Sequence, residues 1–457
     1  MNMDSVFFIG GFLPVLLLLY WLIPGVRGKN ILLLIAGFVF YAFGSLSGLL
    51  LLAVAGIVNY LLGLLAHKKW AMILGVAANL AFLCAYKYLD FLLCDLLGQP
   101  QLSLGLVAPL GISFFTFKAI SYLVDAYRDN TQRARNLPDF LLYISFFPQI
   151  AAGPIARFSD FGSALQSREL TLTNVAEGLR RFTVGLGKKL ILAGTLAVAV
   201  DKVFALESAD IRLAWVGAIG YSLQIYFDFS GYSDMAIGLG NIFGFTTKEN
   251  FLYPYTAVTL GDFWRRWHIS LSTWFRDYLY IPLGGNRKGK FRAGINKLIV
   301  FVLCGLWHGA NVTFLLWGLW HGVLSVLESV GVIPAKKLEK TKVLGRIYTL
   351  LVVCLGFVMF RAASVTQGFE MIGAMFAGFS FTQVGTATLN SIFTGKLLLI
   401  AVLSVVLCLP WKQMLSRREK LWRVLDAISY PAALMLLALC MMALAAGGFA
   451  PFIYAQF

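Results

Sequence analysis

The residues best suited to acid–base chemistry in this sequence are its four histidines, of which His308 has the most favourable position. It ends an otherwise apolar run from Leu298 to Trp307, and the small residues Gly309 and Ala310 follow it. An imidazole with an unperturbed pKa of about 6.5 is largely neutral near pH 7 and can take a proton from a hydroxyl group. We therefore expect His308 to act as a general base whose small neighbours admit a substrate. A hydrogen-bonded packing role is the alternative.

A second candidate site lies in the stretch from Thr259 to Ile281. Thr259 stands three residues before Asp262, a spacing that predicts the N-terminus of a helix. Arg265, His268 and Ser272 follow at helical spacing, so the sequence predicts one helix face rich in hydrogen-bond donors. Such a face suits a thioester carbonyl, a phosphate or a hydroxyl group. For His268 itself, a catalytic and a structural role both remain open.

Further side chains are expected to support these histidines or to line a cavity. His321 lies four residues after Trp317 on one apolar run, where it either orients His308 or pairs with a backbone carbonyl. Asp228 and Asp234 are six residues apart and so lie on different faces of a helix, which favours cavity lining or pairing with arginine over paired-carboxylate hydrolysis. The expected supporting or tunnel-lining set is His321, Asn311, Arg265, Ser272, Trp307, Asp228 and Asp234.

The composition indicates which kind of element positions these residues. Of the 457 residues, 59% are hydrophobic and 13% are charged, which is far more apolar than a soluble globular chain. A helix needs about 20 mostly apolar residues to cross a bilayer, and by this rule we expect roughly ten to twelve transmembrane or re-entrant segments. The sequence predicts an all-α polytopic membrane protein with a single domain over residues 1–457 and its motif-bearing core at 107–330.

Individual segments differ in how clearly they span. The first, Phe7 to Pro24, lacks a basic leader and a cleavage pattern, so we expect a retained helix. Ile31 to Ala66 is long enough for a hairpin, whereas Ile144 to Pro154 is too short to span and is broken by prolines, which predicts a re-entrant segment. Asn174 to Phe204 carries several basic residues and is expected to be tilted or interfacial. The remaining expected segments are Trp70 to Leu97, Leu104 to Tyr127, Arg212 to Phe243, Ile295 to His308, Thr313 to Val330, Val343 to Phe360, Leu397 to Pro410 and Ala427 to Phe457.

The formal charge of +16 comes from short basic clusters between apolar runs, which is typical of cytoplasmic loops facing anionic lipid rather than of a nucleic-acid-binding surface. His67 stands beside two lysines in one such cluster and is expected to be a solvated loop residue. The six cysteines form no CxxC pair and have no histidine nearby at metal-ligand spacing. We expect neither disulfides nor a metal site.

Five stretches along the chain resemble the membrane-bound O-acyltransferase (MBOAT) family, in particular its alginate-acetylating branch. They run from Ile112 to Arg128, Phe146 to Phe158, Tyr226 to Phe245, Asp262 to Gly289 and Leu306 to Gly322. The resemblance implies that His308, in a Trp-His-Gly match, is the catalytic histidine, and that His268, in the WRRWHISLS match, is the second functional histidine. It also implies a ring of helices around a tunnel through a locally thinned membrane.

The function implied by the resemblance is O-acetylation of an extracytoplasmic polysaccharide, alginate or a similar exopolysaccharide, by a multi-pass protein of the bacterial inner membrane. Cytoplasmic acetyl-CoA is the expected acyl donor, with Arg287 and Lys288 as candidates for its phosphates and with no bound cofactor. No GDSL-like serine hydrolase motif is visible, so the SGNH-type extracytoplasmic partner usual in this branch has to act in trans.

Three alternatives remain open from the sequence. The related D-alanyl transporters share the WHISLS and WHG elements, although the continuation from Pro282 to Gly289 resembles the alginate-type branch and favours acetyl over D-alanyl or another acyl group. The second alternative is a polysaccharide transporter with Asp228 and Asp234 in its binding site. A non-catalytic scaffold of a secretion complex is the third.

Overall fold

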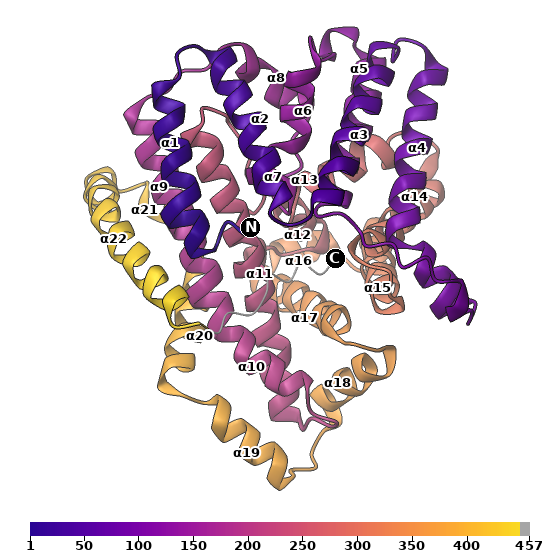
Figure 1. The fold of residues 1–457 in the computed structure, drawn as a ribbon. Helices are drawn as coiled ribbons and strands as arrows, with labels where there is room; N and C mark the ends of the chain where they lie inside the picture. The colour runs from indigo at the N-terminus through magenta and orange to yellow at the C-terminus, as the bar shows by residue number, and fades with distance from the viewer. Residues whose placement is uncertain (448–457) are drawn as a thin grey trace. The chain divides into compact units, whose positions relative to one another are not determined.

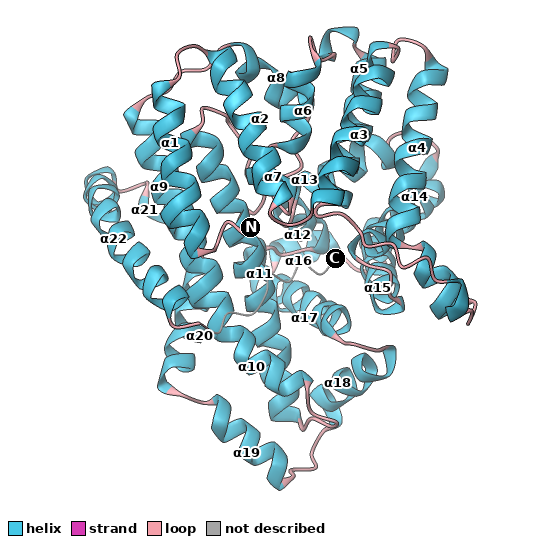
Figure 2. Ribbon diagram, in the orientation of Figure 1, coloured by secondary structure: helices cyan, strands magenta, loops and turns pink. Residues whose placement is uncertain are grey.

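The computed structural model of the chain describes residues 1–447. Within these residues every regular element is a helix (Figure 2), which confirms the predicted all-α fold. The last part of the expected segment Ala427 to Phe457 lies beyond residue 447 and so outside the described residues.

The chain divides into two compact units. The first comprises Met1–Thr183 and Tyr232–Glu249, and the second comprises Val184–Gly231 and the chain from Asn250 onward. The helices α9 (Leu172–Gly187) and α11 (Ile211–Ile242) contribute residues to both units. The expectation of one domain with a core at 107–330 stays a prediction.

The first unit is a set of packed helices, of which those up to α8 are drawn from indigo to purple in Figure 1. The predicted hairpin from Ile31 to Ala66 is confirmed as α2 and α3, and many of the apolar side chains of these two helices are exposed. The helices of this unit, besides parts of α9 and α11, are η1 (Phe8–Phe12), α1 (Leu13–Leu22), α2 (Val26–Ala42), α3 (Leu46–Leu64), α4 (Lys69–Lys87), η2 (Phe91–Leu96), η3 (Pro100–Leu102), α5 (Ile112–Arg128), η4 (Asn130–Gln132), α6 (Leu137–Ser145), α7 (Phe147–Ile150) and α8 (Phe158–Gln166).

The segment expected to be re-entrant is broken as predicted. Helix α6 ends at Ser145, and after the four-residue α7 the chain has no regular structure until Phe158. The buried Lys118 of α5 closes this break, because its Nζ donates to the carbonyl oxygen of Tyr143 at 3.1 Å and to Oε1 of Gln149 at 3.0 Å. The protein thus supplies the hydrogen bonds that lipid cannot give to an interrupted helix.

In the second unit, helices α14 and α15 pack closely against each other. A Cβ added to Gly305 would lie 2.2 Å from the carbonyl oxygen of Phe314, and one added to Gly318 would lie 2.4 Å from that of Phe301. Glycine lets the backbones of membrane helices approach this closely. Besides parts of α9 and α11, the unit contains η5 (Lys188–Ala193), α10 (Gly194–Phe204), η6 (Pro254–Thr256), α12 (Leu260–Arg266), α13 (Ile269–Phe275), η7 (Arg276–Tyr280), α14 (Gly289–His308), α15 (Val312–Val330), α16 (Ala335–Lys340), α17 (Lys342–Arg361), α18 (Val365–Ala377), α19 (Gln383–Ile392), α20 (Gly395–Leu407), α21 (Trp411–Leu415) and α22 (Glu419–Ala445).

The chain is a multi-pass membrane protein. Among the described residues, 7 helices are long and apolar enough to cross a bilayer, or 8 if α19 and α20, bent by 71°, form one broken span. The sequence count of roughly ten to twelve by the length rule also included short and polar segments. Helix α5 has only 17 residues, and the 32 residues of α11 include Gln224 and Asp228. Residues 172–204 form one apolar helix of 33 residues, whose tilt in the membrane stays a prediction.

Candidate functional site

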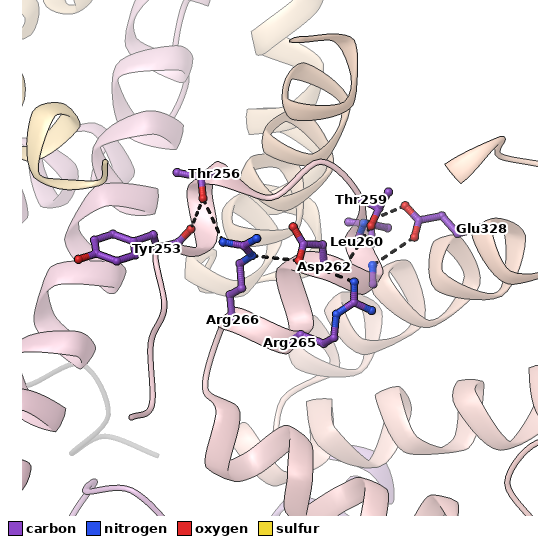
Figure 3. A network of polar contacts seen from close by, with 9 residues as sticks. Tyr253, Thr256, Thr259, Leu260, Asp262, Arg265, Arg266 and Glu328 are labelled. Carbon is purple, nitrogen blue, oxygen red and sulfur yellow. Dashed lines mark hydrogen bonds and ion pairs between the residues drawn. The ribbon is translucent and has the colours of Figure 1, made fainter. Parts of the chain in front are cut away.

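Helix α12 forms the start of the site, and its N-terminus is fixed from two sides (Figure 3). The Thr259 side chain accepts a hydrogen bond from the backbone N–H of Asp262, so the cap expected from the sequence is confirmed. Glu328 of α15 accepts from the backbone N–H groups of Leu260 at 2.8 Å and Gly261 at 3.2 Å. A carboxylate at a helix N-terminus is also favoured by the helix dipole. These bonds hold α12 against α15.

The chain does not continue from α12 as one helix. Helix α12 ends at Arg266, His268 has a left-handed backbone with φ of 43°, and α13 begins at Ile269. The expectation that Arg265, His268 and Ser272 share one helix face was therefore wrong. A non-glycine residue in the left-handed region costs free energy and is held there by its surroundings, a situation that is frequent at functional sites.

The segment around Asn250 supports this break. The backbone carbonyl oxygen of Asn250 accepts from the backbone N–H of Ile269 at 2.9 Å, and the backbone N–H of Leu252 donates to the carbonyl oxygen of Arg266 at 2.9 Å. The Asn250 side chain is 0% exposed, and its Oδ1 lies 3.2 Å from Nδ1 of His268. The same oxygen accepts from the backbone N–H and the hydroxyl group of Ser270. Two donors of Ser270 and the Nδ1 atom of His268 therefore meet at one amide oxygen.

His268 is enclosed by aromatic rings and is 2% exposed. Its ring lies edge to face with Phe229 at 4.6 Å between centroids and 6.0 Å from that of Trp307. His268 belongs to none of the helices that are long enough to cross the membrane. Burial lowers its pKa to about 3, since an apolar enclosure disfavours the charged imidazolium. The imidazole of His268 is thus neutral at physiological pH.

His308 is the last residue of α14 and is 3% exposed. Three aromatic rings surround it, at centroid distances of 5.0 Å for Trp307, 5.2 Å for Trp317 and 5.1 Å for Phe360. These rings come from α14, α15 and α17, so the packing of three helices fixes the position of the imidazole. The buried His321 contacts the far side of this box, with its centroid 5.1 Å from that of Trp317.

A cavity of about 490 Å³ connects these elements. It is lined by both His268 and His308, so the structure brings the two expected functional histidines to one site. Arg265 and Ser272 line it as well, despite the break between α12 and α13. Its lining residues are Trp264, Arg265, Trp267, His268, Leu271, Ser272, Phe275, Arg276, Tyr280, Asn286, Lys297, Val300, Phe301, Cys304 and His308.

The charge of this cavity has one sign. Its described lining includes the cations Arg265, Arg276 and Lys297 and no carboxylate. Two of these cations form ion pairs with residues that are not in the lining, because Oδ1 of Asp262 is 3.7 Å from Arg265 and Oδ1 of Asp277 is 2.7 Å from Arg276. A lining of this kind attracts an anionic ligand.

Several other expected residues lie elsewhere. Arg287 and Lys288 belong to the turn before α14 and are not among the residues that line the cavity. The Asn311 side chain caps α15 by accepting from the backbone N–H of Thr313. Trp307 packs against both histidines without being a lining residue.

The two aspartates form separate ion pairs and do not share a site. In the second unit, Oδ1 of Asp228 lies 2.8 Å from Nζ of Lys189, and both side chains are buried. In the first unit, Asp234 pairs with Arg181 at 2.9 Å, and Arg181 also pairs with Glu249. Pairing with arginine therefore holds for Asp234, whereas the partner of Asp228 is a lysine.

Sequence reasoning missed Asn250, Ser270, Arg276 and Lys297. Asn250 lies 18 residues before His268, so no helical or strand spacing links the two residues. Arg276 and Lys297 sit on different helices, and each resembles an ordinary basic residue at a segment end. The one usable signal was Ser270, two residues after His268 within the stretch already selected.

Comparison with known proteins identifies the family of this chain. A family model described as MBOAT, membrane-bound O-acyltransferase family, matches residues 112–369. The "Probable alginate O-acetylase AlgI" of Pseudomonas aeruginosa is 42% identical over 406 residues, which is 85% of this chain and 78% of the relative. The peptidoglycan O-acetyltransferase of Helicobacter pylori is 35% identical over 65% of this chain and 63% of its own. The teichoic acid D-alanyltransferase of Bacillus subtilis is 31% identical over 45% of this chain and 55% of its own.

The matched region contains α12 to α15 and every residue that lines the cavity. The resemblance noted from the sequence is confirmed by a match that spans more than half of the chain and by relatives that cover most of it. The chain belongs to the membrane-bound O-acyltransferase family and is an O-acyltransferase.

Proposed function

We propose that this enzyme takes acetyl from cytoplasmic acetyl-CoA and passes it across the bacterial inner membrane for O-acetylation of an extracytoplasmic polysaccharide, alginate or a similar exopolysaccharide. The observation that carries the proposal is the cavity in which two imidazoles and three cations face one volume. An acyl-CoA has the matching parts, because its phosphates are anionic and its thioester needs a base at the attacking hydroxyl group.

Arg265, Arg276 and Lys297 are the proposed contacts of the donor phosphates. Arginine suits this role, since its guanidinium group makes two parallel hydrogen bonds to a phosphate. The proposal also keeps Arg287 and Lys288, which lie in the turn between η7 and α14 and were assigned to the same ligand from the sequence. The two sets can be separated by substitution.

His308 is the proposed general base. The acceptor oxygen attacks the carbonyl carbon of the thioester, the C–S bond breaks, and the hydroxyl proton passes through His308 to the departing thiolate of coenzyme A. The proposed reaction needs no cofactor, because the thioester is already activated. The aromatic box around His308 supports the step by holding the ring in one orientation, which is how positioned groups accelerate reactions between bound partners.

The acceptor is proposed from the relatives. The names of the Pseudomonas and Helicobacter relatives favour acetyl transfer to alginate or to another envelope polymer. The D-alanyltransferase match covers less than half of this chain, so transfer of D-alanine or another acyl group is the weaker alternative. An SGNH-type partner acting in trans is part of the proposal, as no such motif was found in the sequence.

A polysaccharide transporter is disfavoured by the ion pairs described above. Asp228 and Asp234 were the candidate sugar-binding carboxylates of that reading, and each is engaged by a basic side chain within its own unit. A carboxylate held in this way has fewer free lone pairs for sugar hydroxyl groups.

Transfer of radiolabelled acetyl in proteoliposomes tests the proposal. With [acetyl-14C]acetyl-CoA outside and the partner protein and polymer inside, the wild type should label the polymer. His308→Ala should lose the transfer and still be a folded membrane protein by size-exclusion chromatography. His67→Ala, a change at an exposed histidine, is the matched control and should transfer normally. Label transfer by His308→Ala at the wild-type rate would refute the assignment, and a wild type that moves polymer without any acyl-CoA would indicate a transporter.

A further inference from the structure

The hydrogen bonds at Asn250 determine which nitrogen of His268 carries the proton. One side-chain atom of Asn250 is in contact with both Nδ1 of His268 and the backbone N–H of Ser270. The backbone N–H of Ser270 lies 3.1 Å from this atom and can only donate. That atom must therefore be the amide oxygen, which fixes the orientation of the Asn250 side chain. Nδ1 of His268 lies 3.2 Å from this oxygen, and two acceptors cannot form a hydrogen bond. The Ser270 hydroxyl oxygen also lies 3.5 Å from Nδ1, but its single proton is directed to Asn250 Oδ1, which is closer at 2.9 Å. Nδ1 of His268 is consequently protonated.

The protonation of the other nitrogen follows. A neutral imidazole carries one proton, so with Nδ1–H donating to Asn250 the nitrogen Nε2 keeps its lone pair. Nε2 of His268 is buried and has no hydrogen-bond partner within the described chain. His268 itself lines the cavity. An unsatisfied buried acceptor carries a free-energy cost, which a ligand that donates to it removes.

We propose that Asn250 and Ser270 are positioning residues, which hold His268 as the Nδ1–H tautomer so that its Nε2 lone pair accepts a hydrogen bond from the substrate hydroxyl group in the cavity. The inference rests on the proposed acyl transfer and deepens it by dividing the labour between the histidines. His308 removes the proton, while His268 orients the hydroxyl group that loses it. An acceptor at this point selects a ligand with an O–H or N–H group over one without.

The surroundings of His268 keep this arrangement stable over a wide pH range. The ionisable groups that share its cavity are Arg265 on α12, Arg276 and Tyr280 on η7, and Lys297, Cys304 and His308 on α14. None of these carries a negative charge in its usual state at neutral pH, so nothing in the described lining stabilises an imidazolium at position 268. The left-handed backbone of His268 and the Asn250 carbonyl bond to Ile269 hold the ring against Asn250.

The tautomer can be measured without any reaction. Protein labelled with 15N-histidine in nanodiscs gives distinct 15N signals for protonated and bare ring nitrogens, and a His268→Gln variant assigns the signals of this residue. We expect a protonated Nδ1 and a bare Nε2 on His268 between pH 5 and 8. A protonated Nε2 on His268 in this range would overturn the inference whether or not acyl transfer itself is correct.

A pH profile tests the positioning role. Asn250→Asp keeps an acceptor oxygen beside Nδ1 but adds a negative charge, which raises the pKa of His268. As pH falls, His268 of this variant gains a proton on Nε2 and can no longer accept a hydrogen bond. We therefore expect kcat/KM of Asn250→Asp to fall about tenfold more than that of the wild type for each unit by which pH drops below the raised pKa.

Two further variants complete this experiment. Asn250→Leu, which removes the acceptor, should lower kcat/KM at every pH, whereas a merely structural Asn250 would give both variants the same pH-independent loss. Asn130→Asp adds the same charge at an exposed position in η4 and should keep the wild-type profile. A wild-type pH profile for a folded Asn250→Asp enzyme would refute the positioning role, and active Asn250 variants with an inactive His308→Ala would leave the proposed function intact.

Discussion

Each unit of this protein contains a buried interruption of a helix, and the two interruptions are completed differently. In the first unit, Lys118 donates to Tyr143 and Gln149, and the Gln149 side chain donates on to Thr247, so the break is closed by protein groups. In the second unit, the break at His268 is anchored by Asn250 but leaves Nε2 without a partner in the described chain. The closed break is thus satisfied by the fold itself, whereas the open break leaves an acceptor that the proposed ligand would satisfy.

The sharpest way to break this comparison is His268→Phe. Phenylalanine keeps the ring among Phe229 and Trp307, and Asn250 keeps its two bonds from Ser270, so the fold should persist. The acceptor nitrogen is lost, and we expect acyl transfer to fall by about 100-fold, the low end of what positioned acid–base groups contribute. Initial rates of acetyl transfer measure the effect, with thermal unfolding as the control. Normal transfer, or a protein that no longer folds, would place His268 with the structural residues.

At the break closed by Lys118, a substitution is expected to lower stability rather than acyl transfer. Lys118→Met removes a buried donor from the carbonyl oxygen of Tyr143 and the amide oxygen of Gln149, so it should lower the free energy of unfolding by about 3 kcal/mol. The transfer rate per folded molecule should change little. Thermal unfolding in detergent measures the loss, and Lys340→Met, at an exposed lysine, is the matched control. If Lys118→Met abolished transfer in a protein of unchanged stability, the distinction between the two breaks would fail.

The sequence predicted the elements better than the site. Apolar runs separated by basic clusters were sufficient for the membrane class and for α2, α3 and the broken segment after α6, because hydropathy and proline act locally. The same reasoning placed His268 on a continuous helix. The neighbouring sequence contains no signal for a left-handed residue, because the asparagine that stabilises it lies 18 residues away. His308 was selected because a polar residue at the end of an apolar run is conspicuous, and the structure places it in the lining of the cavity.

The basic residues proposed for the donor phosphates show the same limit of sequence-based prediction. Arg287 and Lys288 were proposed for the donor as members of a basic cluster expected at the cytoplasmic face, whereas the cavity is lined by Arg265, Arg276 and Lys297, which three separate elements bring together. Which side chains share a volume depends on tertiary packing and has no periodic signature. Clustering along the chain and clustering in space are thus competing criteria for the donor site.

The smallest effect is expected when the lining cations and the pair Arg287 and Lys288 are substituted separately. Arg276→Gln with Lys297→Gln removes two of the three charges that line the cavity, so KM for acetyl-CoA should rise about tenfold while kcat changes less, because a phosphate contact binds the ground and transition states alike. Arg287→Gln with Lys288→Gln should raise KM by a smaller factor, since these side chains are not among the lining residues. Arg417→Gln with Lys420→Gln, at exposed positions, controls for the loss of net charge near the membrane. A larger effect from the 287–288 pair than from the 276–297 pair would mean that the donor phosphates bind outside the cavity, and that proximity in sequence was the better guide for this ligand.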